Sequence, residues 1–375
     1  MSAPAAGRWV LVSKPLREPF RDGSTVLART LVERLPERFR LTYFGDPARP
    51  LRPGAGDEIL PARPMPLSPG LWDKARVLRS VADPRRRRLP LHFFFTPNRV
   101  SSVVLAALQR LPPRRTVVQD LTSSHGATRF VPLLRSLDAI VVHSEFARRN
   151  LAGAGVAAER LSCILPGVAS DRPAAEPQRH RRLLYAGDLE QPVIDRLLAL
   201  RPLLRHGALA EWSLCIASRP KSGADLDLRA QLRLAFAEEL AADRVEILGQ
   251  VEEMGALFRR TALQIFLAEH VARKVDLPLV LLEGLALGVP LIALDVPPVS
   301  EIFELGRKHG LCPGLAVAAG EFEGAIVSAA RRAGVLAEWG RGARELARRE
   351  FSAERMVAEY ARLYDGLERQ QGGGR

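Results

Sequence analysis

The chain has 375 residues, enough for two domains, and its 47% hydrophobic content describes a globular protein rather than a disordered one. Its formal net charge is +13, carried almost entirely by arginine, but the densest basic run, DPRRRRLP at 83–90, has no interleaved aromatic residues and matches no nucleic-acid-binding module. We therefore expect no nucleic-acid partner. The arginines at 85–88 are either a solvated run or a site of attraction for an anionic membrane or phosphorylated substrate.

Neither apolar runs nor cysteines point to secretion or to a membrane span. No apolar run reaches about 18 residues without a charge or a cluster of turn residues. The first fifteen residues lack a basic segment followed by a long apolar one. Cys163, Cys215 and Cys312 are widely spaced, as is typical of small core residues in a reducing compartment. We expect a cytoplasmic protein, at most peripheral at the membrane face.

Short apolar runs alternate with helical patterns in the first half. A buried strand is predicted at 9–13, followed by a helix at 24–35, and a Pro/Gly-rich loop extends from 46 to about 70. The other strand candidates in this half are 41–45, 89–97, 115–121, 138–144 and 161–168. Strands that alternate with helices predict a parallel, doubly wound α/β sheet covered on both faces.

A polar, proline-containing segment at 170–182 interrupts this pattern and is the best candidate for a linker. A second series then follows, with a helical pattern at 228–242 and an amphipathic end at 353–367. Its strand candidates are 182–188, 212–218, 244–250, 263–269 and 289–295. Two such domains predict a ligand cleft at the carboxyl ends of two sheets.

One carboxylate lies in an apolar stretch, because Glu283 is the single charged residue between Leu277 and Leu294. If a helix begins at Leu277, the residues three and four positions from Glu283 are all apolar, so this face should be covered. A buried carboxylate without a partner costs several kcal/mol. We therefore expect Glu283 to bind either a ligand or an arginine at the domain interface. The adjacent Gly284 predicts close approach of another group.

Several segments, in order, resemble the retaining glycosyltransferases of GT-B fold, a large family of bacterial sugar transferases. LLYAGDLE resembles the strand and loop that open their nucleotide-sugar domain, and DLPLVLLEGLALGVP resembles their helix-and-strand signature. FSAERMVAEYARLYDGL resembles their closing helix. The remaining similar segments are 21–35, 137–170 and 243–269, and the resemblance covers most of residues 8–367.

The resemblance implies two Rossmann-like doubly wound parallel-sheet domains that face a cleft, with a C-terminal helix that crosses back to the first domain. It implies transfer of a sugar, with retention, from a nucleotide-diphosphate sugar to a hydroxyl acceptor, without a metal or a further cofactor. The implied boundaries are an acceptor domain at 1–170, a linker at 171–182, a nucleotide-sugar domain at 183–350, a closing helix at 351–369 and a disordered tail at 370–375.

In relatives, the residue that matches Glu283 ends an E-x7-E motif and hydrogen-bonds the ribose of the donor. The first Glu of that motif falls on Val275 here. The adjacent Asp276 is either a helix N-cap or a contact of the donor sugar. The donor-binding candidates are Glu283, Gly187, Arg219, Lys221, Asp276, Leu279 and Gly249.

The Arg/Lys clamp that holds the donor diphosphate in relatives is absent, since GDLEQPVI contains Asp188 and no lysine. A departing diphosphate still requires positive charge. Arg273 and Lys274, beside a predicted helix N-terminus, are the first candidates, and Arg219 and Lys221 are the second. A solvated loop is the alternative interpretation of either pair.

Relatives carry His-Asp or His-Gly after the strand at 115–121, where this chain has Gln119 and Asp120. His125 then lies either near the donor sugar or on a surface loop. His143 and Ser144 follow the next strand and either face the cleft or start a helix. The catalytic candidates are His125, Lys274 and Arg273, and the acceptor and phosphate loop is expected to contain Gly23, Ser24 and Asp120.

Two functions remain open at this point. The first is a glycosyltransferase that acts on a glycan, a lipid-linked or a small-molecule acceptor. The second is a catalytically impaired relative that binds a sugar nucleotide or serves as a scaffold in glycan or glycolipid assembly. The missing clamp favours the second, and no His/Asp/Glu cluster in the sequence has metal-ligand spacing.

Overall fold

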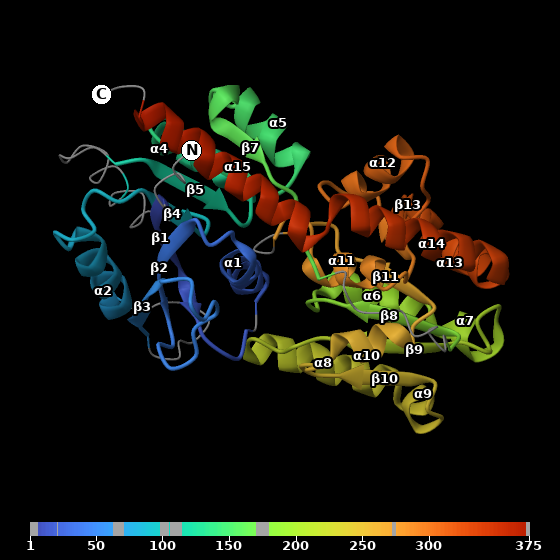
Figure 1. Ribbon diagram of the computed structural model, residues 1–375. Coiled ribbons are helices and arrows are strands. Elements are labelled where there is room, and N and C mark those ends of the chain that lie inside the picture. The colour runs from blue at the N-terminus through green and yellow to red at the C-terminus, as the bar shows by residue number, and fades with distance from the viewer. Residues whose placement is uncertain are drawn as a thin grey trace. The chain divides into compact units, whose positions relative to one another are not determined.

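The computed structural model describes residues 7–20, 22–62, 71–97, 105, 115–169, 180–271 and 275–372. The chain divides into two compact units (Figure 1). The N-terminal unit contains Met1–Gly167, Ala272–Leu277 and Ala353–Arg375, and the C-terminal unit contains Val168–Val271 and Pro278–Ser352. The N-terminal unit therefore takes a short segment and a long helix from the second half of the chain.

The N-terminal unit contains a seven-stranded parallel sheet of order β3-β2-β1-β4-β5-β6-β7. Its strands are β1 (Gly7–Leu16), β2 (Phe39–Gly45), β3 (Glu58–Pro61), β4 (Leu91–Phe94), β5 (Val117–Leu121), β6 (Ala139–Val142) and β7 (Leu161–Cys163). The apolar runs predicted as strands all occur. The edge strand β3 was missed inside the predicted loop because its four residues are half-buried or exposed and carry no alternating pattern.

Helices and one-turn 3₁₀ segments surround this sheet. They are α1 (Gly23–Arg34), α2 (Leu71–Ala82), η1 (Ala127–Phe130), α4 (Val131–Leu134), α5 (Glu145–Gly153), η2 (Ala158–Arg160) and α15 (Ala353–Gly372). The C-terminal helix α15 packs against α1, and the Tyr364 ring stacks on Trp9 with 4.0 Å between centroids. This confirms the closing helix that returns to the first domain. It continues to Gly372, beyond the expected end at residue 369.

The C-terminal unit contains a six-stranded parallel sheet of order β10-β9-β8-β11-β12-β13. Its strands are β8 (Arg182–Ala186), β9 (Ser213–Ala217), β10 (Val245–Leu248), β11 (Leu263–Phe266), β12 (Leu291–Leu294) and β13 (Gly314–Val317). The five predicted strands are confirmed. The edge strand β13 was missed because only its first residue is buried and that residue is a glycine. Most of the predicted linker, residues 170–179, lies outside the described residues.

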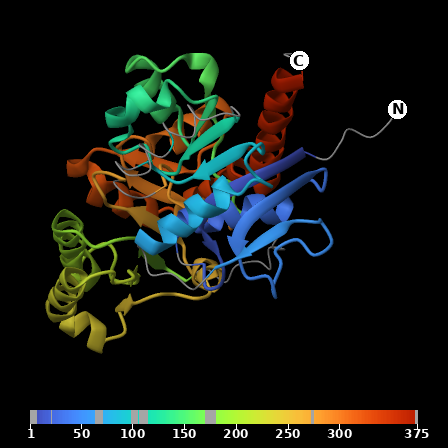
Figure 2. The ribbon, with the colours of Figure 1, turned by 90° about the vertical axis from the view of Figure 1, so that its left-hand side faces the viewer.

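The helices of the C-terminal unit cover both faces of its sheet (Figures 1 and 2), and α11 packs against α14. Among the described residues of the whole chain, no helix has the length and apolar character needed to cross a membrane. The helices are α6 (Gln191–Ala199), α7 (Arg201–His206), α8 (Gly223–Ala235), α9 (Ala237–Ala241), α10 (Met254–Arg259), α11 (Leu279–Ala286), α12 (Ser300–Lys308), η3 (Ala319–Glu321), α13 (Phe322–Ala330) and α14 (Ala333–Glu350).

Candidate functional site

Each sheet reverses its strand order at one point, and five of the predicted site residues follow the strands there. In the C-terminal unit β8 lies between β9 and β11, and in the N-terminal unit β1 lies between β2 and β4. Doubly wound sheets bind ligands at the carboxyl ends of such strands. Gly187 follows β8, Arg219 and Lys221 follow β9, and Gly23 and Ser24 follow β1. The topology therefore places these predicted residues at the carboxyl edges of the two sheets.

The loop after β8 is fixed from within the C-terminal unit. The buried Tyr185 hydroxyl donates to the Asp188 carbonyl, and a Cβ at Gly187 would lie 2.9 Å from that hydroxyl oxygen. Gly187 N–H donates to the Ala217 carbonyl at 3.1 Å. The absence of a side chain at Gly187 is thus explained by the tyrosine below the loop, whether or not a phosphate also approaches it.

Lys221 lies beside this loop as an ion pair. Its Nζ is 2.7 Å from Asp188 Oδ1, and the two side chains are 39% and 32% exposed. The pair joins the loops that follow β8 and β9, and it puts a carboxylate next to one of the cations proposed for the diphosphate. Sequence reasoning identified both residues but did not predict that they bind each other.

The neighbouring strand end at Gly249 is held by an arginine that sequence reasoning missed. Arg229 on α8 donates to the carbonyls of Ser218, Ile247 and Leu248 at 3.0–3.1 Å. Its guanidinium lies 3.4 Å from the position of a Cβ at Gly249. Arg229 therefore connects the ends of β9 and β10, and a basic residue four positions from Arg233 on a helix gave no sign of this role.

Glu283 lies on α11, the helix that carries the resemblance, and it is half-buried. It is thus less covered than its apolar neighbours indicated, while Leu279 at the start of the helix is 8% exposed. The predicted close approach at Gly284 is confirmed, because a Cβ there would lie 2.5 Å from the Gln264 side-chain oxygen. Gln264 Nε2 in turn donates to the carbonyls of Leu281 and Val289. A buried amide, rather than a ligand, occupies the space beside the glycine.

Asp276 is 1% exposed, and both oxygens of its carboxylate are used inside the N-terminal unit. Oδ1 accepts from the backbone N–H and the hydroxyl of Ser124, each at 2.8 Å, and Oδ2 accepts from the Ser144 hydroxyl at 2.9 Å. The interpretation of Asp276 as a helix N-cap is wrong, since Pro278 precedes α11 and no side chain caps it. The pKa of Asp276 is raised, because the effect of burial exceeds the lowering effect of the hydrogen bonds from Ser124 and Ser144.

Asp120 is fully buried, and its carboxylate is the centre of a second group of hydrogen-bonded side chains. Its Oδ1 lies 2.9 Å from His143 Nε2, and its Oδ2 accepts from the Tyr360 hydroxyl of α15. Burial alone would raise the pKa of Asp120. The charge and hydrogen bond of His143 lower it by more, so the pKa falls to about 2. The pKa of His143 is raised, because the effect of Asp120 exceeds that of burial. Both shifts favour the charged form of the pair.

His143 and Asp120 were expected near a ligand, but both are 0% exposed and bind each other. His143 does not face a cleft; its Nδ1 lies 2.8 Å from the Ile164 carbonyl. The alternative for Ser144 is confirmed, since its hydroxyl accepts from Ala147 N–H and caps α5. Tyr360 was missed as a partner, because nothing in an amphipathic helix shows which carboxylate its tyrosine will meet.

The loop after β1 carries a polar cluster around Asp22, which caps α1. Asp22 accepts from Thr25 N–H at 3.0 Å, from the Ser24 hydroxyl at 2.5 Å, and lies 3.1 Å from Lys14 Nζ. Burial raises the pKa of Asp22, but the hydrogen bond of Ser24 and the charge of Lys14 lower it below its ordinary value. Sequence reasoning named Gly23 and Ser24 and missed Lys14 and Asp22, although an Asp before Gly-Ser is a helix-start signal.

His125 is exposed on the turn between β5 and η1. Arg273 and Lys274 lie outside the described residues, so their predicted role stays a prediction. Across the described ranges, no group of three or more His, Cys, Asp or Glu side chains could hold a metal ion.

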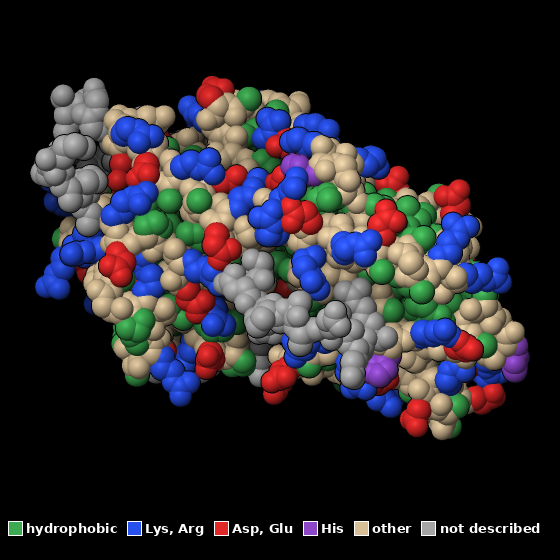
Figure 3. Space-filling model, turned by 45° about the vertical axis from the view of Figure 1, so that its right-hand side comes forward, with side chains coloured by type: hydrophobic (Ala, Val, Ile, Leu, Met, Phe, Trp, Pro, Cys, Tyr) green, Lys and Arg blue, Asp and Glu red, His purple; other side chains and the backbone are tan. Residues whose placement is uncertain are grey.

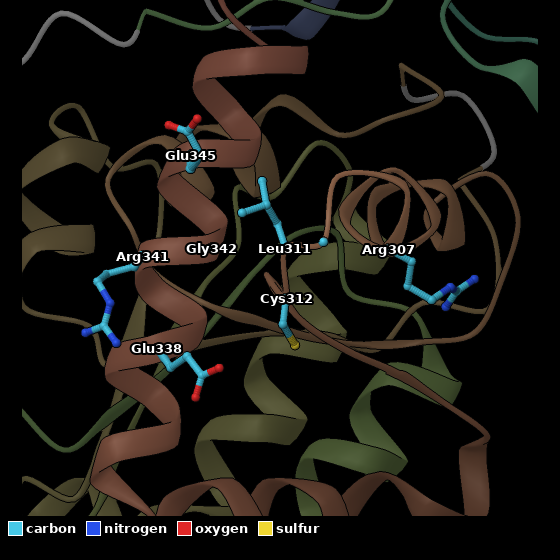
Figure 4. Close-up of a pocket in the computed structure, with 8 residues that line it drawn as sticks. Arg307, Leu311, Cys312, Glu338, Arg341, Gly342 and Glu345 are labelled. Atoms are coloured by element: carbon cyan, nitrogen blue, oxygen red, sulfur yellow. The ribbon is translucent and has the colours of Figure 1, made fainter.

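A separate pocket of about 600 Å³ in the C-terminal unit is lined by residues of α12, of α14 and of the segment before β13 (Figure 4). Arg307 lies near the end of α12, and Glu338, Arg341 and Glu345 come from α14. Glu345 already pairs with Arg348 and Arg349. None of the predicted site residues lines this pocket, and we assign no role to it.

Solved structures with low sequence identity share this architecture. Sucrose-phosphate synthase from Thermosynechococcus elongatus superposes with a TM-score of 0.74 at 17% identity, over 97% of this chain and 100% of that one. HepE from Anabaena, solved with UDP and glucose, has a TM-score of 0.70 at 14% identity, over 96% and 99%. WaaB, a lipopolysaccharide outer core galactosyltransferase, has a TM-score of 0.62 at 13% identity, over 94% and 98%. None of the curated proteins matches the chain in sequence.

The fold is therefore GT-B: two Rossmann-like units of parallel sheet flanked by helices, with a C-terminal helix that packs on the first unit. Within this fold, residues 180–333 match a family model described as "Glycosyl transferases group 1". The matched segment covers most of the C-terminal unit, including the loop after β8, the α11 helix and Glu283.

Proposed function

We propose that the protein is a glycosyltransferase that moves a sugar, with retention, from a nucleotide-diphosphate sugar to a hydroxyl acceptor. The observation that carries this proposal is the family match over residues 180–333. The matched segment contains the sheet whose strand order reverses beside the predicted donor residues. That HepE has been solved with UDP and with UDP-glucose supports a nucleotide-sugar donor. The acceptor belongs to the same proposal and is a glycan, a lipid-linked sugar or a small molecule.

Glu283 is the proposed ribose contact. A half-buried carboxylate on α11 accepts hydrogen bonds from hydroxyl groups without being fully removed from water, so an incoming ribose diol is a suitable partner. Leu279 lies one helical turn earlier on α11 and would pack against the nucleoside. This role fixes the position of the donor rather than its chemistry.

Positive charge beside the donor diphosphate would stabilise the leaving group as the glycosidic bond breaks. Lys221 and Arg219 follow β9, and Lys221 pairs with Asp188 in the loop after β8, so in this proposal they would supply part of that charge. Arg273 and Lys274, just before α11, remain candidates for the rest. In this proposal the donor phosphate assists departure, the acceptor attacks on the same face, and neither a metal nor a further cofactor is required.

The N-terminal unit would bind the acceptor. Gly23 and Ser24 open α1, and the positive end of this helix favours an anionic or polar group. His125 is exposed and remains a candidate for the donor sugar. The sequence predicted Asp120 as part of the acceptor and phosphate loop with Gly23 and Ser24. Its carboxylate is bound to His143 and Tyr360, however, so Asp120 would act only by holding β5, β6 and α15 together.

A catalytically impaired relative is the second candidate. The observation that favours it is the Asp188–Lys221 ion pair, because a carboxylate 2.7 Å from the lysine offsets the positive charge that a diphosphate requires. Such a protein would bind a sugar nucleotide or act as a scaffold in glycan or glycolipid assembly without transferring the sugar.

Calorimetric titration with a panel of UDP-, GDP- and ADP-sugars tests the proposal. We expect micromolar binding of one donor and roughly 10- to 100-fold weaker binding by Glu283→Ala, as one or two hydrogen bonds to a charged group are lost. Glu304→Ala is the matched control, because Glu304 is an exposed carboxylate on α12 of the same unit. Unchanged affinity in Glu283→Ala, or no binding of any donor, overturns the ribose site.

Release of the nucleoside diphosphate separates the two candidates. A transferase hydrolyses its donor slowly or transfers the sugar when an acceptor extract is added, and the anomeric configuration of the product is then read by NMR. Binding of the donor without release on any acceptor supports the impaired relative. Inversion at the anomeric carbon would contradict retention alone.

A further inference from the structure

The outer face of α2 carries exposed apolar side chains on a helix that the core fixes from the other side. Val81 is 2% exposed and Val77 packs against the core of the N-terminal unit. Trp72, on the opposite side, is 89% exposed, and Leu78, on the flank between the two sides, is 38% exposed. In Figure 2 this helix lies in front of the strands of its unit, toward the viewer. A single exposed tryptophan needs no partner by itself, so what surrounds it on the surface decides its meaning.

Arginines surround these apolar residues. Arg76 and Arg79 follow Trp72 at four and seven positions, so the three share one face of α2, and both are exposed. Arg85, Arg87 and Arg88 are exposed in the turn that follows. In the described part of the chain, none of these five arginines forms an ion pair. The surface made by Trp72, Leu78 and these five arginines is called the α2 surface below.

Arg86, in the middle of the same basic run, is used differently. It binds Glu58 and Asp83 and donates to the Ser80 carbonyl at 3.2 Å, so it holds the end of α2 to the edge strand β3. Arg115 donates to the Val81 carbonyl from the other side at 2.9 Å. The charges on the α2 surface are thus presented by a helix whose position is fixed, rather than by a loose basic segment.

The excess of basic residues elsewhere is not arranged in this way. On the face drawn in Figure 3, Lys and Arg side chains are interspersed with Asp and Glu. Exposed leucines also occur on α8, at Leu226 and Leu234, but that helix begins with acidic residues, and its Arg229 is bound to carbonyl groups. Within the described residues, α2 is therefore where unpaired arginines and exposed apolar side chains coincide.

We propose that the α2 surface docks the protein on an anionic phospholipid membrane. A tryptophan ring is suited to the headgroup level, and arginines around it would bind the lipid phosphates while their apolar stems lie along the surface. Charge complementarity selects this partner over a neutral one, because five unpaired arginines would repel each other without anions between them. The inference does not depend on sugar transfer, and a protein partner or a nucleic acid is an outcome of the test.

Flotation of the full chain with vesicles at 150 mM salt tests this docking. We expect binding to vesicles that contain 30% phosphatidylglycerol and little binding to pure phosphatidylcholine. Arg85→Gln/Arg87→Gln/Arg88→Gln should weaken partition on the order of 100-fold, at roughly fivefold per arginine. The control Arg307→Gln/Arg331→Gln/Arg332→Gln removes the same charge from exposed positions of the C-terminal unit and should change it little. Arg86 is kept in both variants because it is structural.

Tryptophan fluorescence provides a second readout. Trp72 is exposed while Trp9 and Trp212 are buried, so insertion should shift the emission to shorter wavelength on anionic vesicles and Trp72→Phe should remove most of that shift. Circular dichroism confirms that each variant is folded. Three outcomes overturn the proposal: no flotation of the wild type, equal losses in the two arginine triples, or tighter binding to duplex DNA than to anionic vesicles at the same salt. Donor titration is measured separately, so failure here leaves the proposed reaction untouched.

Discussion

The predicted carboxylates of the two units differ in how far the protein covers them. In the N-terminal unit Asp120 and Asp276 are at most 1% exposed, and protein groups occupy the oxygens of both carboxylates. In the C-terminal unit Asp188 and Lys221 pair at the surface, and Glu283 is half-buried. Asp120 and Asp276 thus belong to an internal polar framework, whereas Asp188 and Glu283 are only partly covered. The comparison teaches that a predicted site carboxylate remains a donor-site candidate only where the protein does not bury its side chain.

The largest effect is expected for Asp120→Asn. The change leaves a buried His143 without its counter-charge, and removing one partner of a buried ion pair costs about 3–5 kcal/mol. Denaturant unfolding followed by tryptophan fluorescence measures the loss, and hydrogen exchange shows whether β5 and β6 are affected. Asp188→Asn in the C-terminal unit is the control, for which a change of about 0–1 kcal/mol is expected of a surface pair.

The pH dependence of stability gives this prediction a sign. The folded pKa of Asp120 is about 2 against an ordinary value of 3.8, so its contribution is present above about pH 4 and is lost as the pH falls toward 2. The folded pKa of His143 is raised above 6.5, so its contribution is complete below that value and is lost as the pH rises through the folded pKa. Both slopes should be smaller in Asp120→Asn. Identical pH profiles for the two proteins would contradict a charged pair.

A smaller effect is expected at Asp276. Asp276→Ala leaves the buried Ser144 hydroxyl and the half-buried N–H and hydroxyl of Ser124 without an acceptor, at a cost of about 1–3 kcal/mol. Asp276→Asn should cost less than about 1 kcal/mol, because its amide oxygen still accepts from Ser124, its amino group can donate to the Ser144 hydroxyl, and no charge is buried. Thermal and chemical unfolding measure both variants.

Donor binding and pH separate this interpretation from a sugar contact at Asp276. Its folded pKa is raised above 3.8, so ionisation opposes folding, and the stability of the wild type relative to Asp276→Asn should fall as the pH rises above that value. We expect Asp276→Asn to bind the nucleotide sugar with unchanged affinity. A loss of tenfold or more without loss of stability would assign Asp276 to the donor after all.

The sequence predicted the strands of both sheets well, because buried parallel strands are continuous apolar runs. It failed for β3 and β13, short edge strands with little buried surface. It identified Gly284 as a point of close approach but could not name Gln264 as the group. For Asp276 it offered a helix cap or a donor-sugar contact, because the true partners, Ser124 and Ser144, are 152 and 132 residues away and only the fold brings them together. Local spacing reports helix faces and strand ends, whereas the partner of a buried carboxylate is decided by tertiary contact.

The smallest effect sharpens the C-terminal side of the comparison. If the surface pair competes with a donor diphosphate, Asp188→Asn should tighten binding of a nucleoside diphosphate several-fold, since it removes a negative charge beside Lys221. Lys221→Ala should weaken binding by a similar factor, and both effects should shrink as salt screens the exposed charges. Calorimetric titration with UDP and GDP at low and at physiological salt measures both, and neither variant should change the free energy of unfolding by more than about 1 kcal/mol. Equal affinities in the wild type and both variants would place the diphosphate away from the β8 and β9 loops and leave the residues before α11 as its remaining site.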